Sequence, residues 1–120
     1  MEIQAPHLAA LIERLFTAAG CQASEAETIA RRLVQANLVG HDSHGVIRAP
    51  IYIRWLQQEM VRANQSPKVV LDSGPLGLLD GQLGFGQVMG EHAMRMAIEK
   101  AETCGVAVVG LRNSGHVGRV

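Results

Sequence analysis

The hydrophobic residues of this chain change their spacing once, near residue 65, and this change limits the folds that the chain can adopt. Before it, apolar residues recur at the three- and four-residue intervals of amphipathic helices. After it come short apolar runs separated by glycine and proline, as in strands and tight turns. We therefore predict an α+β (α/β-like) protein, with helices in residues 1–64 and a β-β-α-β segment in residues 65–120.

Three amphipathic helices are expected before the change, over residues 6–19, 24–39 and 48–60, and they would form an N-terminal helical bundle. Ser24, with Glu27 three residues later, matches a capping box, in which two side chains satisfy amide donors at the start of a helix. The second helix is therefore expected to begin at Ser24.

After the change, strands are expected at residues 68–72, 76–80 and 106–111, with a long helix at residues 87–104. Residues 106–111 are apolar almost throughout, which is typical of a strand covered on both faces. One buried strand with two short companions makes a poor sheet. We therefore expect this chain to be the N-terminal portion of a longer protein.

Composition argues against two classes of function. The formal net charge is zero, with 11 Lys and Arg residues against 11 Asp and Glu residues, whereas a nucleic-acid-binding protein needs a basic face. No apolar run approaches the roughly 20 residues that span a bilayer, and we expect no secretory signal, because the first residues lack a basic region followed by an apolar one. We expect a soluble, cytoplasmic protein with no nucleic-acid or membrane partner, in which Cys21 and Cys104 are small, buried apolar residues.

A first polar cluster, G-H-D-S-H-G-V-I-R-A-P-I-Y, occupies residues 40–52 at the end of a helical pattern. The cluster contains His44, and an unperturbed histidine titrates near neutrality and can exchange a proton with a hydroxyl or carbonyl group. Arg48 offers a planar fork that matches a carboxylate, and Tyr52 lies one helical turn further, so its hydroxyl can share that face. Taken singly, His44 could instead be a capping or buried histidine and Arg48 a solvated charge. Grouped on one helix-loop-helix, these side chains favour a site for an anionic substrate.

A second polar cluster, R-N-S-G-H-V-G-R, occupies residues 112–119 directly after the last apolar run. Ligands of α/β proteins gather at the carboxyl ends of strands. Asn113, Ser114 and His116 could make polar contacts there. Gly118 lets the backbone approach a ligand closely, and Arg119 could meet a phosphate. Spacing alone is a weak signal, because loops of this composition are also ordinary turns.

A metal site is not expected, since His41 and His44 form an H-x-x-H pair that lacks a third ligand at a recognisable spacing. No glycine fingerprint of a Rossmann dinucleotide site follows a strand. No Ser-His-Asp or Cys-His nucleophile arrangement can be argued either. The side chains of metal-binding type that were considered are His41, Asp42, His44, His92 and His116.

The chain resembles the malate/L-lactate dehydrogenase family, which is separate from the Rossmann lactate and malate dehydrogenases. The resemblance covers essentially all 120 residues and rests on three motifs in order. They are A-N-L-V-G-H-D-S-H-G-V-x-R-x-P-x-Y at residues 36–52, L-D-G-x-x-x-F-G-Q at 79–87 and A-x-E-K-A-x-x-x-G-V-A-V-V-x-x-R-N-S-x-H-x-G-R at 97–119.

The resemblance implies hydride transfer between NAD or NADP and a small 2-hydroxy acid or 2-oxo acid such as malate or lactate. It also implies that residues 65–120 begin a mixed-sheet cofactor-binding domain that is not of Rossmann type. Family members are homodimers or larger and much longer than this chain. The alternative is that the chain is a non-catalytic truncated fragment or a helical interaction module.

Carried over by position, the resemblance implies a role for each motif residue. His116 would be the acid/base that handles the proton of the substrate hydroxyl, with His44 as the second candidate for proton transfer. His44 would also line both the nicotinamide and the substrate. Ser43 and Arg48 would contact the substrate carboxylate, and Tyr52 would form a pocket wall. The start of a cofactor-contacting segment would be Gly118, Arg119 and Val120.

Overall fold

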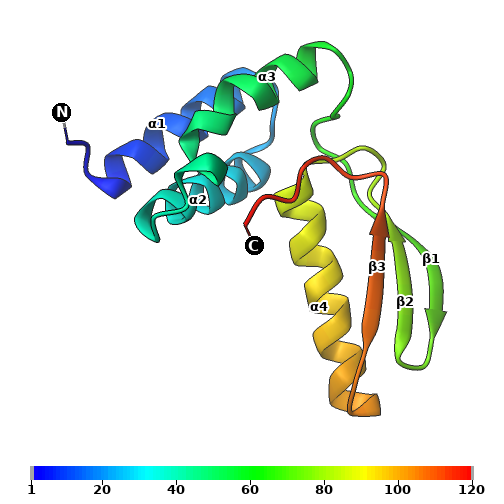
Figure 1. The fold of residues 1–120 in the computed structure, drawn as a ribbon. Helices are drawn as coiled ribbons and strands as arrows, with labels where there is room; N and C mark the ends of the chain where they lie inside the picture. Colours follow the sequence, from blue (N-terminus) through cyan, green and yellow to red (C-terminus); the bar gives the residue numbers. More distant parts are fainter. Residues whose placement is uncertain (1, 120) are drawn as a thin grey trace. The chain divides into compact units, whose positions relative to one another are not determined.

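The computed structural model describes residues 2–119, and the chain divides into two compact units (Figure 1). The helical unit extends to Asn64, and the sheet unit comprises Gln65–Gly118. Residues 2–119 form four α-helices and a small mixed sheet, which is the expected α+β fold.

The helical unit consists of three α-helices with two short 3-10 turns between the second and the third. α1 and α2 pack along each other because each presents an apolar stripe, which includes Phe16 on α1 and Ile29 and Leu33 on α2. The elements are α1 (Ala5–Ala18), α2 (Ala23–Leu38), η1 (Asp42–His44), η2 (Val46–Arg48) and α3 (Ala49–Gln57).

The predicted capping box at the start of α2 is wrong. The helix begins at Ala23, its N-cap residue is Gln22, and the Gln22 side chain makes no capping hydrogen bond. Instead, Asn64 binds this end of the helix from the far end of the unit. Its Oδ1 accepts the Gln22 amide at 2.7 Å, and its own amide donates to Glu25 Oε2 at 2.8 Å. A contact between residues distant in sequence therefore replaces the local motif.

The third helix is shorter than predicted. It ends at Gln57, and Glu59 adopts a left-handed φ of 56°. The amides of Glu59 and Met60 then fold back to donate to Leu56 O and Trp55 O. Residues 46–48 form the 3-10 turn η2 just before the helix, whose first turn contains Pro50 as expected.

The two cysteines are both free but differ in environment. Cys21 is buried as predicted, and burial, together with the neighbouring Glu25 carboxylate, raises the pKa of its thiol to about 12. The prediction of a buried residue is wrong for Cys104, which is exposed at the end of α4 (Gly86–Cys104), directly before Gly105.

The sheet unit contains a three-stranded mixed sheet with one long helix packed against it. β1 pairs antiparallel with β2, and β2 pairs parallel with β3, so the strand order is β1-β2-β3. The parallel pair places Asp80 opposite Arg112, at the carboxyl ends of both strands. The elements are β1 (Lys68–Ser73), β2 (Leu76–Asp80), α4 (Gly86–Cys104) and β3 (Val108–Arg112).

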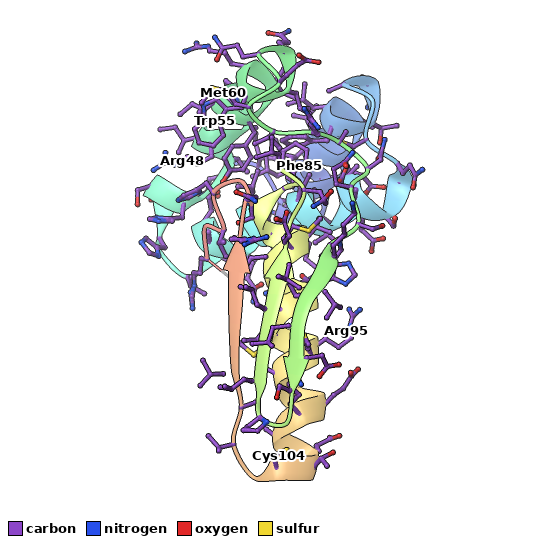
Figure 2. All side chains as sticks on the ribbon, turned by 90° about the vertical axis from the view of Figure 1, so that its right-hand side faces the viewer. Arg48, Trp55, Met60, Phe85, Arg95 and Cys104 are labelled. Carbon is purple, nitrogen blue, oxygen red and sulfur yellow. The ribbon has the colours of Figure 1, made fainter. Side chains whose placement is uncertain are left out.

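The last strand is not covered on both faces, contrary to the prediction. Val108 at its start is 64% exposed, and residues 109–111 are only half-buried. Among the described residues, β3 is an edge of the sheet, and α4 packs against one face only, behind the strands in Figure 2. An apolar run is therefore not sufficient to predict a strand buried on both sides.

Within residues 2–119, no helix is both long and apolar enough to cross a membrane. The longest, α4, has 19 residues, but charged side chains such as Arg95, Glu99 and Lys100 interrupt it.

Candidate active site

The first polar cluster lies on the turn between α2 and α3, in the helical unit. Gly40, with a φ of +77°, ends α2, and the chain then passes through η1, Gly45 and η2 before α3 begins. This path brings Ser43, His44 and Arg48 into one group, as the sequence predicts.

Asn37, in the last turn of α2, forms hydrogen bonds with both ends of the segment of residues 42–46. Its Nδ2 donates to Asp42 Oδ1 at 2.7 Å, and its Oδ1 accepts the Val46 amide at 2.9 Å. A Cβ atom added to Gly45 would lie 2.2 Å from Asn37 Oδ1, so only glycine fits there. The sequence indicates no role for Asn37, and the only local sign of one is Asp42, five residues further on.

Replacing Asn37 by aspartate should weaken this turn in a pH-dependent way. The new carboxylate would face Asp42 Oδ1 where an amide donor now stands, so two negative charges would meet in place of a hydrogen bond. We expect the free energy of unfolding to fall by about 1–3 kcal/mol at neutral pH. The loss should be smaller near pH of about 4, where one carboxyl is protonated and can donate again.

Urea unfolding at the two pH values measures this effect. The matched control is Gln35→Glu, which adds the same charge at an exposed position of α2. Equal losses in the two variants at both pH values would contradict a specific role for the Asn37 amide.

His44 has contacts that favour its neutral form. Its Nδ1 lies 2.9 Å from Ser43 Oγ, and its ring centroid lies 4.2 Å from that of His41. Partial desolvation, and then the neighbouring His41 and Arg48, lower the pKa of His44 below its usual value. A neutral imidazole at neutral pH can accept a proton or line an uncharged ring.

Arg48 is half-buried, and its Nε donates to Ser43 O at 2.7 Å. No hydrogen bond within residues 2–119 uses its two Nη atoms, so the outer edge of the guanidinium can receive a carboxylate. Tyr52 is buried, at 2% exposure, and its ring stacks on Trp55 with centroids 5.5 Å apart. Of Arg48 and Tyr52, only Arg48 is therefore partly exposed to solvent.

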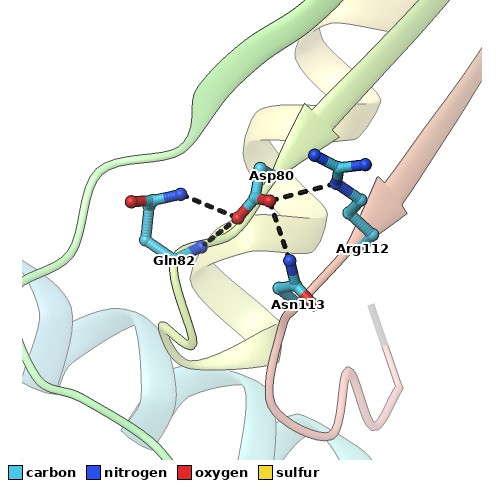
Figure 3. A network of polar contacts seen from close by, with 4 residues as sticks. All are labelled: Asp80, Gln82, Arg112 and Asn113. Atoms are coloured by element: carbon cyan, nitrogen blue, oxygen red, sulfur yellow. Dashed lines mark hydrogen bonds and ion pairs between the residues drawn. The ribbon is translucent and has the colours of Figure 1, made fainter.

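The second polar cluster lies in the sheet unit, at the carboxyl ends of β2 and β3. Asp80 organises it, because its carboxylate accepts four hydrogen bonds (Figure 3). The donors are the Gln82 amide (3.0 Å), Gln82 Nε2 (2.7 Å), Arg112 Nε (3.0 Å) and Asn113 Nδ2 (2.8 Å).

These bonds lower the pKa of Asp80 to about 2, with the Gln82 amide as the largest cause and Asn113 next. Asp80 is therefore charged at any physiological pH. The sequence marks Asp80 as the end of a strand and as a position of the L-D-G motif, but it does not indicate this role. Its role depends on the parallel register that sets it opposite Arg112, and no local pattern encodes that register.

His116 follows this network on a loop that packs against the start of α4. A Cβ atom at Gly86 would lie 2.3 Å from both the carbonyl carbon and oxygen of His116, so the backbones touch directly. Gly118 has a left-handed φ of +70°, and a Cβ there would lie 3.4 Å from Gln87 Nε2 and 3.8 Å from His116 Nδ1. The loop thus places the His116 ring beside a half-buried glycine.

The remaining candidates are dispersed. Arg119 is exposed, and Val120 lies outside the described residues. Within residues 2–119, no three histidine, cysteine, aspartate or glutamate side chains converge in a way that would hold a metal ion.

Comparison with known proteins identifies the class. The sequence profile of the malate/L-lactate dehydrogenase family matches residues 3–120. The chain therefore belongs to the malate/L-lactate dehydrogenase family, as its motifs indicate.

Two relatives and a solved structure illustrate the likeness. Hydroxycarboxylate dehydrogenase B of Escherichia coli (strain K12) is 42% identical over 113 residues, which are 94% of this chain and 31% of that protein. The malate dehydrogenase of Pyrococcus abyssi is 36% identical over 118 residues, 98% of this chain and 33% of that protein. The structure of malate dehydrogenase from Pyrococcus horikoshii superposes with a TM-score of 0.94 at 34% identity, covering 98% of this chain and 34% of that chain. The chain thus spans about a third of the length of the curated relatives it matches.

Proposed function

We propose that the full-length protein is an oxidoreductase that transfers a hydride between NAD or NADP and a small 2-hydroxy acid or 2-oxo acid, such as malate or lactate. The observation that carries the proposal is the turn of residues 42–48. There, an imidazole with a lowered pKa lies beside a guanidinium whose Nη atoms have no partner within residues 2–119. Such a pair can bind a carboxylate and, next to it, an uncharged reacting group.

In this proposal Arg48 and Ser43 bind the substrate carboxylate, and Tyr52 forms a wall of the pocket. Arg48 is prepared for this role because its bond to Ser43 O fixes the guanidinium before the substrate arrives. His44 lines the substrate and the nicotinamide as a neutral ring.

His116 is proposed as the acid/base of the reaction. In the oxidation, its imidazole takes the proton of the substrate hydroxyl while the hydride leaves the carbon that bears this hydroxyl; in the reduction, it returns the proton to the oxygen. The nicotinamide, when bound, supplies the hydride acceptor or donor. His116 is suited to this role because its loop is packed against Gly86 and bonded to Asp80 through Asn113.

The residues present fit a bound nucleotide at Gly118. This glycine has no side chain to occupy the space beside Gln87 and His116, and its left-handed φ is accessible without strain. Gly118 and Arg119 are proposed to contact the cofactor together with Val120. We further propose a cytoplasmic homodimer, for which light scattering of the full-length protein is the check; a monomeric mass would contradict it.

The deciding experiment is an absorbance assay of the full-length protein at the nicotinamide band. It should be run with NADH and NADPH against oxaloacetate, pyruvate, bulkier 2-oxo acids and a cyclic imino acid. We expect turnover of at least one 2-oxo acid, and the two cofactors compared on that acid give the preference. If no 2-oxo acid is turned over, the proposal fails; turnover of the cyclic imino acid alone would redirect it to imine reduction.

Arg48→Ala should mainly raise the Michaelis constant of the 2-oxo acid. Loss of a charge-assisted, two-pronged bond costs about 1.5–3 kcal/mol, or roughly 10- to 100-fold in the constant. Arg48→Lys should recover little, because an ammonium cannot form the paired bonds. The control is Arg54→Ala, which removes an exposed arginine of α3, the helix that directly follows Arg48. An unchanged Michaelis constant in Arg48→Ala would remove the carboxylate assignment.

A further inference from the structure

The carboxylate of Asp80 binds two loops that are distant in sequence, and it assigns one oxygen to each. Oδ1 accepts both bonds from Gln82, on the loop between β2 and α4. Oδ2 accepts the bonds from Arg112 and Asn113, where β3 ends and the His116 loop begins. The side chain of Asp80 is only 12% exposed, so it lies between the two loops rather than in solvent.

The same two loops are also joined by main-chain hydrogen bonds that continue from Asp80 towards His116. Three main-chain amides donate hydrogen bonds from one loop to the other, across the junction that we call the seam. These bonds run from Gly81 N to Arg112 O (2.8 Å), from Leu83 N to Asn113 O (2.7 Å) and from Gly115 N to Gly84 O (2.8 Å). Gly115, the donor of the last bond, directly precedes His116, and the backbone of His116 packs on Gly86.

Three residues at this seam have an uncommon backbone conformation. Gln82, Leu83 and Asn113 adopt left-handed φ values of 54°, 60° and 50°, although none of them is glycine. Such conformations persist only where the surroundings hold them, and they gather at functional sites. Two of the three residues, Gln82 and Asn113, donate directly to Asp80. A carboxylate that merely paired with a surface arginine would not require this geometry.

We infer that Asp80 is a positioning residue for His116: it fixes the loop of residues 112–116 against the loop of residues 81–85, and so sets where the His116 ring lies. The inference rests on the proposed role of His116 in proton transfer. It deepens that proposal by naming the group that holds the proton-transferring residue in place.

The chemistry of the four donors requires a carboxylate. All the groups that face Asp80 are N–H donors, and both of its oxygens are used. An asparagine would offer one oxygen to one loop and would turn an NH₂ group towards the donors of the other. Asp80→Asn, nearly identical in volume, should therefore release one loop while keeping the fold.

The kinetic test compares Asp80→Asn with Asp72→Asn in the full-length protein. Asp72 is a matched control, because it is an exposed carboxylate on the neighbouring strand β1, paired with Lys100. A misplacement of about 1 Å in a catalytic group can cost about 100-fold in rate, so we expect kcat to fall by about 10- to 100-fold in Asp80→Asn, with little change in KM. Asp72→Asn should behave as wild type.

A double variant separates positioning from general destabilisation. If Asp80 acts through His116, then Asp80→Asn should lower kcat little further once His116→Ala is present. A full additional loss in the double variant, or a normal kcat in Asp80→Asn alone, would overturn the inference.

A second readout does not depend on activity. Amide exchange at Leu83 and Gly115 should become faster in Asp80→Asn, while exchange in the middle of α4, at Ala97, stays unchanged. If the wild-type protein turns over no acid but this selective change occurs, the proposed function has failed. The inference that Asp80 holds the two loops together then still stands. Equally faster exchange at all three amides, or no change at any of them, would overturn the inference that Asp80 holds the two loops together. Should Asp80→Asn not fold, Arg112→Ala removes one of the four bonds and should give the same selective pattern at smaller size.

Discussion

His116→Ala in the full-length protein should lower kcat by about 10²- to 10⁴-fold, because under the proposed role of His116 the variant has no group at this position to exchange a proton with the substrate hydroxyl. The pH dependence of kcat should lose one limb at the same time, because the proposed proton-transferring group is absent from the variant. Steady-state kinetics across a pH series measure both effects. Substrate affinity should change much less, as the carboxylate contacts are assigned to other residues.

The matched control for this variant is His92→Ala, which removes a half-buried histidine of α4 in the same unit. It should leave the rate and the pH profile near wild type. A fully active His116→Ala would remove the acid/base assignment, and His44 would then be the group to test for proton transfer.

Gly86→Ala should have the second large effect, because a methyl group has no room at this position. Its carbon would lie 2.3 Å from the carbonyl carbon and oxygen of His116 and 2.4 Å from Gly115 O. These neighbours are backbone atoms and cannot rotate away. We expect the His116 loop to shift, with a loss of about 100-fold in kcat and of about 1–3 kcal/mol in the free energy of unfolding.

Gly110→Ala is the control for Gly86→Ala. It adds the same methyl group within β3, where the nearest atom is the flexible Cδ1 of Leu78 at 3.0 Å, and a small rotation of that side chain makes room. Kinetics should be recorded well below the melting temperature of each variant, so that unfolding does not reduce the rate. A wild-type kcat in Gly86→Ala would show that the position of the loop is not critical.

The sequence predicts the order and type of the regular elements well because each has a clear local pattern. The strand at residues 76–80 has its predicted bounds, and the helix predicted at residues 87–104 begins one residue earlier, at Gly86. The grouping of Ser43, His44 and Arg48 is also local, since all three lie on one short turn that follows Gly40.

Two features could not be predicted for the same reason, which is that each depends on contact between residues distant in sequence. Ser24 and Glu27 match a local capping motif, but Asn64 binds the start of α2 instead. Asp80 acquires its role only when β2 and β3 pair in a register that no single motif specifies. The motif glycines Gly45 and Gly86 are predictable as motif positions, but the reason for each is a neighbouring group: the Asn37 amide in one case and the His116 backbone in the other.

The hydrogen bonds of Asn64 have a consequence for how the helical unit forms during synthesis. Asn64 receives the Gln22 amide, donates its own amide to Glu25 and donates its Nδ2 to Gly20 O at 2.9 Å, which closes a span of 42 residues between it and Gln22. The ribosome releases α1 and α2 well before this residue emerges. Until then the first turn of α2 lacks these partners and frays, because a short helix in water gains little from its own backbone bonds. The three helices should therefore become stable together, in one cooperative step that can occur only after Asn64 has been synthesised.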